Sequence, residues 1–574
     1  MVNKKSSKIL PITLATLISL STMLFSCKPG SDGQDNSESG DNDKPPITFN
    51  LGESIEVMTE TLGAGGTISV DDKGDPLDGL TIDVPKNAYS TPTTFTLSYQ
   101  PISDVKAKDD ALVLSPLISI DNGGDYSDEL IEVIMPVTMP DDYFAMAFYY
   151  DPETGDFEGI HTQNFEDGTI EFITRHFSKF TVFGLQQGKL DHLEIETDFK
   201  PGRDSWNLEN IGSYVSPGGY CHGMTLTALY YKDWHWLSQP YRAPTEYLWK
   251  NDNDNGLGSG METPDFWRDD KWAIQLCSVA NSMKMTNEGL RLTLEYASQV
   301  ESLMPDTKIT FAAQEFYNIA FALWLSTSAQ LVSVRSTSLD YAGHALICYG
   351  IDNNVLRIAD PNYPDNAELK IVYDNSKAKF QNYSGGGYNF DIVIFSGSTT
   401  FYDWQKLDSL WEQFDRQDLG EYFPEYGILV TEYDSDGNEG ESFEFRPTEG
   451  LTTSAKYLQF RIYAPFDSRA NIYRFEDLDN SLSPDRVELD PGDNLLGIYV
   501  ESLVEGLWWW AGFDWVNITF TDEEEPNTGI DVYECSHIES LRNNCRRGIY
   551  YTKCPDGTCW KCVDGEPVRV DCSD

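Results

Sequence analysis

The chain is poor in basic residues: 41 Lys and Arg stand against 93 Asp and Glu, for a net charge of −52 over 574 residues. A surface this acidic repels a phosphate backbone, so we expect no nucleic-acid partner. We interpret the acidity as a means of solubility outside the cell. The seven histidines include no pair at metal-ligand spacing with a third ligand, and no Gly-rich phosphate loop occurs. We therefore expect no cofactor and no metal.

Long hydrophobic runs are also scarce, and the clearest lies at the N-terminus. The run Ile9–Phe25 follows three lysines, is broken by Pro11 and ends beside Cys27. A helix that stays in a bilayer needs about 20 apolar residues, so this segment is a poor membrane span. It resembles a lipoprotein signal with its lipobox. The resemblance implies removal of residues 1–26, a lipid on Cys27 and a location in the cell envelope, at the outer membrane or cell surface.

The rest of the chain is long enough for several hydrophobic cores. Lys28 to Pro46 is rich in Gly, Ser, Asp and Asn, which predicts a flexible tether. We expect a multidomain protein, divided into a tether over 27–61, a β-sandwich over 62–188, an α+β domain over 189–400, a second β-sandwich over 401–526 and a disulfide-rich module over 527–574.

The first sandwich is predicted by short alternating runs such as Leu80–Val84 and Thr94–Tyr99, separated by turn residues. Gly65–Val70 and Ile82–Ala88 resemble the β-sandwich domain shared by zonula-occludens proteins and netrin receptors. His176–Val182 is similar to the last strand of such domains in bacterial lipoproteins. This resemblance implies a spacer or docking module.

The texture changes after residue 189, where helical periodicity comes first and strand patterns follow. Helices are predicted at Thr225–Trp236, Thr286–Leu303 and Phe311–Leu325, and strands at Leu331–Val334, His344–Tyr349 and Val355–Ile358. This order is typical of an α+β domain.

Alternation resumes after a short helix expected within 401–419, in Gly427–Val430, Leu458–Tyr463 and Leu496–Val500. These runs predict the second sandwich. Trp508, Trp509, Trp510 and Trp515 also fall here, and three consecutive tryptophans cannot all face one core from a strand. We expect some exposed aromatic surface, suited to a glycan or protein partner.

The last segment is dense in cysteine, which in an exported protein indicates three disulfides around a small core. The six residues are Cys535, Cys545, Cys554, Cys559, Cys562 and Cys572. All fifteen pairings remain open. A zinc site at Cys559 and Cys562 is the weaker alternative, because no second such pair occurs.

Cys221 is the candidate nucleophile. A reactive thiolate is stabilised by a helix N-terminus and by a histidine. Pro217, Gly218 and Gly219 break the chain before Cys221, and the apolar residues after it have helical spacing. The pattern places Cys221 on the first turn of a helix.

His344 is the candidate base, at the start of a strand. Asp352-Asn353-Asn354 then predicts a tight hairpin turn, which brings residues 360–363 back beside His344. A side-chain oxygen there can orient the imidazole. We choose Asp360, with Asn362 as the alternative, because the register is uncertain by one or two residues.

This order of Cys221, His344 and Asp360 resembles papain-like cysteine peptidases, nearest to their bacteriocin-processing, peptidase-like branch, over roughly residues 195–400. The resemblance implies a thiol hydrolase that cleaves peptide or protein substrates. That family carries a Gln about six residues before the cysteine to bind the oxyanion, but Val215 occupies this place. Asn207 or Asn210 could supply the amide, and we favour Asn210.

The remaining cysteines and histidines have simpler interpretations. Cys277 and Cys348 are expected to be small buried hydrophobes, with pairing between them as a lesser alternative. His222 projects about 100° away from Cys221 around a helix, which makes it a poor base.

Two other functions remain open. Transglutaminase-like acyl transfer shares the order Cys, His, Asp, but the long gap between Cys221 and His344 counts against it. The non-enzyme alternative is an adhesive or scaffolding surface lipoprotein with an inert papain-like domain.

Overall fold

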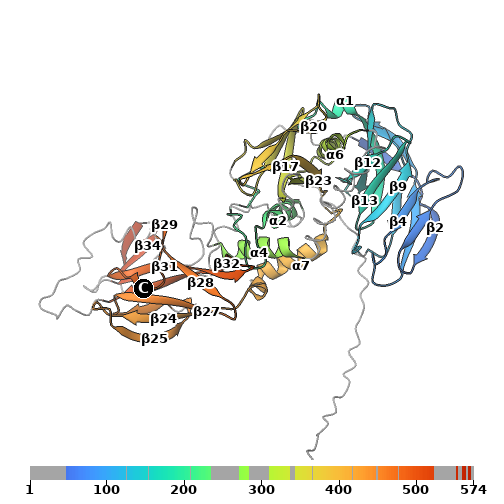
Figure 1. Cartoon of the computed structure of the whole chain (residues 1–574). Helices are drawn as coiled ribbons and strands as arrows, with labels where there is room; N and C mark the ends of the chain where they lie inside the picture. The colour runs from blue at the N-terminus through green and yellow to red at the C-terminus, as the bar shows by residue number, and fades with distance from the viewer. Residues whose placement is uncertain are drawn as a thin grey trace, which may run out of the picture.

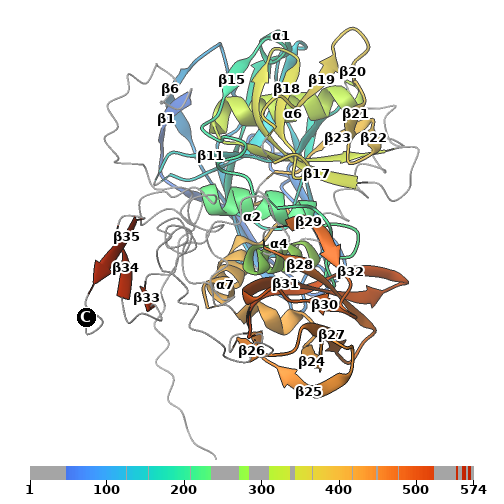
Figure 2. The same cartoon turned by 90° about the vertical axis from the view of Figure 1, so that its left-hand side faces the viewer.

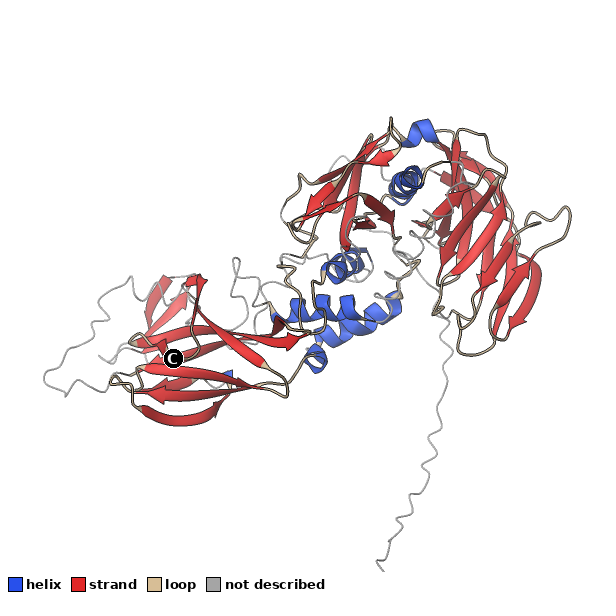
Figure 3. Ribbon diagram, in the orientation of Figure 1, coloured by secondary structure: helices blue, strands red, loops and turns tan. Residues whose placement is uncertain are grey.

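The computed structural model describes residues 47–233 except 125, 153 and 207, then 270–283 and 309–336, and finally 343–521 except 365, 398, 417, 448–449 and 476. Three short strands between 551 and 570 complete the description. The chain is mostly β, and its helices lie between two β-rich ends (Figures 1 and 3). No helix in this part of the chain is long and apolar enough to cross a membrane. The predicted signal peptide and Cys27 lie outside the described residues.

The N-terminal end contains two large sheets that face each other around one core, in the manner of a sandwich. The first sheet has the order β11 (Phe157–Gly159), β10 (Tyr143–Tyr150), β14 (Lys179–Gln186), β8 (Leu117–Asp121), β5 (Thr93–Gln100), β2 (Ile55–Leu62), with β7 (Leu112–Val113) beside β14. The second has the order β12 (Thr162–Asn164), β13 (Thr169–Thr174), β9 (Ile131–Pro136), β4 (Thr81–Val84), β3 (Gly66–Ser69). Alternate residues such as Leu97 and Val133 fill the space between them.

The prediction of a tether over residues 27–61 extends too far along the chain, because folded strands already begin within this range. β1 (Ile47–Leu51) pairs with β6 (Ile102–Ala107), and β2 begins at Ile55 and pairs with β5. Backbone pairing to strands far along the chain orders this segment, although its own composition is largely polar. The first folded unit therefore begins at about residue 47.

The middle of the chain forms one antiparallel sheet with helices on both faces. Its order is β20 (Lys379–Phe380), β19 (Lys370–Asp374), β18 (Val355–Ala359), β17 (Gly343–Asp352), β16 (Gln330–Arg335), β23 (Ile392–Phe395), with β15 (Glu194–Glu196) beside β17. Along β17, Ile347 faces α2 (Cys221–Asp233) while Leu346 and Cys348 face α6 (Phe311–Ser326). The sheet is thus covered on both sides, as Figure 2 also shows.

The helix α6 joins the middle sheet to the N-terminal sheets. Nearly all its residues are buried, because β10, β11 and β12 cover its other side. Its polar residues meet partners there: Glu315 accepts from the backbone N–H of Phe395 at 2.7 Å and lies 2.6 Å from Nε2 of His161. Asn318 and the backbone of Thr162 exchange two hydrogen bonds. The N-terminal sheets are therefore fastened to the middle region by buried polar contacts as well as by apolar packing.

The C-terminal end contains a second pair of sheets around its own core. One has the order β25 (Glu439–Phe445), β24 (Gly427–Tyr433), β27 (Tyr457–Tyr463), β30 (Val487–Glu488). The other has the order β26 (Leu451–Thr453), β32 (Leu507–Phe520), β31 (Gly492–Val504), β28 (Ser468–Arg474), β29 (Asp477–Leu482).

Smaller elements complete the chain. They are α1 (Gln187–Leu190), α4 (Lys271–Ser282), α7 (Trp404–Asp415), the 3-10 helix η3 (Asp418–Tyr422), the hairpin β21 (Tyr383–Gly385) and β22 (Tyr388–Phe390), and the sheet of β33 (Tyr551–Lys553), β34 (Cys559–Val563) and β35 (Glu566–Val570). The predicted helix at 286–303 and the side chains of the six C-terminal cysteines lie outside the described residues.

Glu315→Ala should lower the free energy of unfolding by about 3–5 kcal/mol, because it leaves His161 and the N–H of Phe395 buried without their acceptor. The midpoint and slope of urea unfolding measure the change. Glu488→Ala is the control, since its ion pair with Lys456 is exposed and contributes little. Equal effects of the two substitutions would contradict the assignment.

Candidate active site

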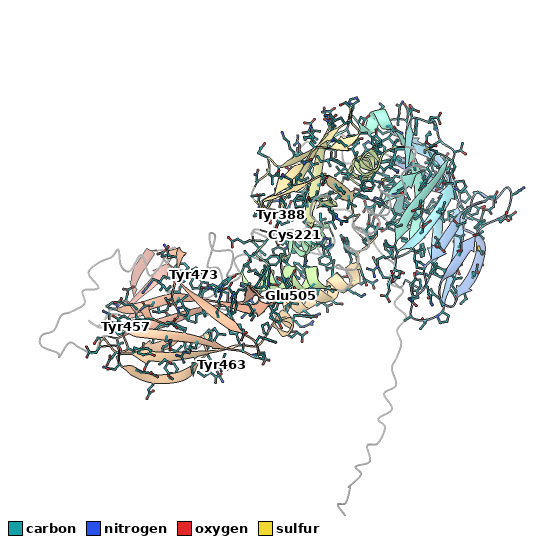
Figure 4. The ribbon with its side chains drawn as sticks, viewed as in Figure 1. Cys221, Tyr388, Tyr457, Tyr463, Tyr473 and Glu505 are labelled. Atoms are coloured by element: carbon teal, nitrogen blue, oxygen red, sulfur yellow. The ribbon has the colours of Figure 1, made fainter. Side chains whose placement is uncertain are left out.

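Cys221 is the first residue of α2, which confirms the predicted helix start. Its side chain is partly exposed. The turn before it depends on Gly218 and Gly219, whose φ angles of +90° and +132° are ones that other residues rarely adopt. At this helix end the backbone N–H groups favour a negative charge. Figure 4 marks Cys221 in the middle region of the molecule.

The helix α4 supports this end of α2 at very short range. A Cβ on Gly223 would lie 1.9 Å from the carbonyl oxygen of Cys277, so only glycine permits the crossing. Asn281 then accepts from the N–H of Gly223 at 3.1 Å and donates to Oγ of Ser216 at 2.8 Å. The start of α2 and the loop before it are therefore both bonded to the side chain of Asn281.

His344 lies on β17, paired with Val334 of β16. The hairpin turns at Asn353 and Asn354, as predicted, and Asp352 pairs with Val355.

A bulge between Cys348 and Gly350 then shifts the register by one residue. Because of this shift, Asp360 and Asn362, and not their neighbours, come to the side of the strand that carries His344.

The ring of His344 is tightly held. Its Nε2 lies 2.6 Å from Oδ1 of Asp360, and both side chains are buried, with His344 7% and Asp360 1% exposed. Asp360 Oδ1 also accepts from the N–H of Asn362 at 2.7 Å, and its other oxygen accepts from the hydroxyl of Tyr383. These bonds leave Nδ1 as the ring nitrogen for the sulfur of Cys221.

The thiol and the imidazole shift each other's pKa. Burial alone would raise the pKa of Cys221, but the charge of His344 and a hydrogen bond to it prevail and lower it. Burial would likewise lower the pKa of His344, yet Cys221 and Asp360 raise it. The pKa of Asp360 is lowered, since its bonds to His344 and Tyr383 outweigh the effect of burial. The arrangement favours a thiolate beside an imidazolium.

Asn210, the residue predicted to supply the oxyanion amide, lies at the site, and both its amide oxygen and its amide nitrogen form hydrogen bonds. Its Oδ1 accepts from the N–H of Tyr220 at 2.6 Å, and its Nδ2 donates to Oδ1 of Asn362 at 3.0 Å. Val215 packs against the apolar core. Asn207 lies outside the described residues.

Cys277, Cys348 and His222, the other residues considered from the sequence, have buried side chains. Cys277 and Cys348 are buried and free, so the alternative of a bond between them is wrong. Burial raises the pKa of both thiols, that of Cys348 to about 12. His222 is buried against Tyr402, with ring centroids 5.0 Å apart.

Sequence reasoning missed the hairpin of β21 and β22. A Cβ on Gly385 would lie 3.0 Å from Oδ2 of Asp360, and one on Gly386 would lie 2.9 Å from Nδ2 of Asn362. The hairpin thus shields this side of the site from water. The run of three glycines at 385–387 is the signal that could have indicated it.

The C-terminal sheets also reach the site. The N–H of Tyr214 donates to the carbonyl of Trp510 at 2.7 Å, which joins β32 to the loop before Cys221. A Cβ on Gly212 would lie 2.8 Å from the ring of Trp509 and 2.9 Å from the nitrogen of Gly219. Trp510 and Trp515 are buried, whereas Trp508 and Trp509 are partly exposed. Of these four tryptophans, only Trp508 and Trp509 contribute to the expected exposed aromatic surface.

No group of three His, Cys, Asp or Glu side chains within the described ranges is arranged to hold a metal ion. The site that Cys221, His344 and Asp360 build contains a thiol, an imidazole and a carboxylate.

Gly212→Ala should destabilise the loop before Cys221, because the new methyl group meets both the Trp509 ring and the backbone. Gly218→Ala is a matched control: it shares a positive φ but has open space around its Cβ. We expect the free energy of unfolding to fall by about 1–3 kcal/mol more in the Gly212 variant than in the Gly218 variant, and Cys221 to be alkylated more slowly. Thermal unfolding and mass-spectrometric labelling measure the two effects. Identical behaviour of the two variants would show that the contact with Trp509 does not stabilise the loop.

Acid should destabilise the protein through its buried histidines. Burial lowers the pKa of His176 and of His222 to about 4. An unfolded histidine titrates near 6.5, so the unfolded chain binds more protons between pH 6.5 and 4, and stability falls as pH falls. His222→Gln should remove on the order of 3 kcal/mol of this loss. Unfolding midpoints at pH 7 and pH 4.5 measure it; an unchanged difference between the two pH values would exclude His222 as a cause.

No family model matches this chain, and a search of curated proteins finds no significant relative. The case for a function therefore depends on the geometry of the residues themselves.

Proposed function

We propose that the chain is a cell-envelope thiol hydrolase of peptide or amide bonds, with Cys221 as nucleophile, His344 as base and Asp360 as the group that orients the base. The proposal depends on the position of the His344 ring between two partners. The ring is hydrogen-bonded to the Cys221 thiol on one side and to Asp360 on the other. The papain-like identity of residues 195–400, the lipid on Cys27 and the C-terminal disulfides are parts of the same proposal.

The chemistry follows from these positions. Cys221 gives its proton to His344, and the thiolate attacks the substrate carbonyl carbon. The imidazolium then gives the proton to the departing amine nitrogen as the carbon–nitrogen bond breaks, which leaves a thioester on Cys221. His344 takes a proton from water, the resulting hydroxide attacks the thioester, and the acid product leaves as the thiol is restored.

The wider arrangement supports the same function. A cysteine on the first turn of a helix faces an antiparallel sheet that carries the histidine, and the partly exposed Cys221 can be reached by a substrate while Asp360 is buried. The shielded carboxylate keeps its negative charge on the imidazole, where low dielectric makes it most effective.

Iodoacetamide should label Cys221 before Cys277 and Cys348 at pH 6, because its thiol pKa is lowered and those of the other two are raised. His344→Ala should slow the labelling of Cys221 by roughly tenfold or more, since the positive charge beside the sulfur is lost. Peptide mapping by mass spectrometry gives the rates.

Turnover tests the remainder of the proposal. A peptide library should yield new amino termini with the wild-type chain and none with Cys221→Ala, while Cys348→Ala serves as a control that retains cleavage. Cleavage that survives in Cys221→Ala would defeat the assignment of the nucleophile. Glycan binding without any turnover would instead favour the adhesive function.

A further inference from the structure

Two side-chain amides connect the loop before the nucleophile to the base. Asn210 accepts from the N–H of Tyr220, the residue before Cys221, and donates to Oδ1 of Asn362 at 3.0 Å. Nδ2 of Asn362 lies 3.2 Å from Nε2 of His344. The connection therefore crosses the site from α2 to the sheet.

The orientation of both amides follows from one backbone group. The N–H of Tyr220 can only donate, so the atom of Asn210 that faces it must be the oxygen. This turns Nδ2 of Asn210 towards Asn362, which must then present its own oxygen. As a result, Asn362 presents its NH₂ group to the ring of His344. Amide oxygens and nitrogens are often hard to assign, but here the pairing decides both.

We infer that Asn210 and Asn362 are positioning residues that form a directional amide bridge, which presents a hydrogen-bond donor, and not an acceptor, to Nε2 of His344. The inference rests on the proposed function and gives Asn210 a role other than that of oxyanion donor. Two donors cannot bond each other, so Asn362 opposes a proton on Nε2 while Asp360 favours it. The bridge thereby limits how strongly the imidazolium is stabilised.

The other groups around the ring are few within the described residues. Cys221 faces it from α2 and Asp360 from the end of β18, while Tyr383 of β21 acts through Asp360. Phe390 of β22 stacks near the ring, with centroids 6.1 Å apart, and carries no charge. A change in the orientation of the Asn362 amide should therefore change the proton affinity of the His344 ring directly.

Asn210→Asp in the full chain tests the bridge. The carboxylate still accepts from Tyr220, but its second oxygen now faces Asn362 and should turn that amide over, which brings the Asn362 oxygen to Nε2 as an acceptor. When the rate of Cys221 alkylation by iodoacetamide is plotted against pH, it changes at two pH values. The lower step is the transition at which the thiolate forms, and the upper step is the transition at which the imidazolium loses its proton. We expect the midpoint of the upper step to rise by about one pH unit, a tenfold change in proton affinity.

The same substitution in an Asn362→Leu background separates the bridge from a simple effect of charge. A through-space effect of the new carboxylate would persist there, whereas turning of the amide would not. Equal shifts in the two backgrounds overturn the bridge. Asn281→Asp, an amide that bonds the same loop outside the bridge, should leave the upper step unmoved.

Asn362→Asp gives a second, isosteric check, because it brings an acceptor to Nε2 without the intermediate residue. It should raise the upper step by at least as much as Asn210→Asp. If Asn210→Asp instead lowers turnover by roughly 100–1,000-fold with the upper step unchanged, Asn210 is an oxyanion donor and the inference fails. Alkylation requires no substrate, so a protein without turnover but with a shifted step would fail the proposed function and retain the bridge.

Discussion

The hydrogen bond between the buried imidazole of His344 and the buried carboxylate of Asp360 is the interaction on which the site depends. Two such groups are costly to remove from water unless each has its partners. Asp360 has three donors, from His344, Asn362 and Tyr383. With its charge satisfied in this way, the carboxylate can hold a positive imidazole beside Cys221 and so favour the thiolate.

The rest of the fold keeps these groups in place. The thiol of Cys221 comes from a helix and the imidazole of His344 from a strand, so their separation depends on how α2 packs against β17. Close contacts at Gly223 and Gly212 set that packing from α4 and from β32. The N-terminal sheets hold the opposite face of the middle sheet through α6. The proposed chemistry thus depends on all three parts of the chain, although each β-rich end also has a core of its own.

Several elements could be predicted because local pattern governs them. The start of α2 at Cys221, the turn at Asn353 and Asn354, and three strands of the middle sheet, β16, β17 and β18, follow from glycine, turn residues and alternation. The helix α4 was missed although Ala273, Leu276, Cys277 and Ala280 have helical spacing. Its polar residues Gln275 and Ser278 are buried as well, so the apolar pattern is interrupted. The strands β1 and β2 were missed because their pairing partners, and not their composition, order them.

The sequence by itself determined the candidate residues of the site, because a thiol, an imidazole and a carboxylate of suitable kind and order occur at Cys221, His344 and Asp360. It also determined that Cys221 begins a helix, since the glycines before it cannot extend one. Only the tertiary structure decided between Asp360 and its neighbours, because a one-residue bulge sets the register. The partners of Asn210 were likewise beyond the sequence: they lie on segments far along the chain, and their hydrogen bonds exist only once those segments meet.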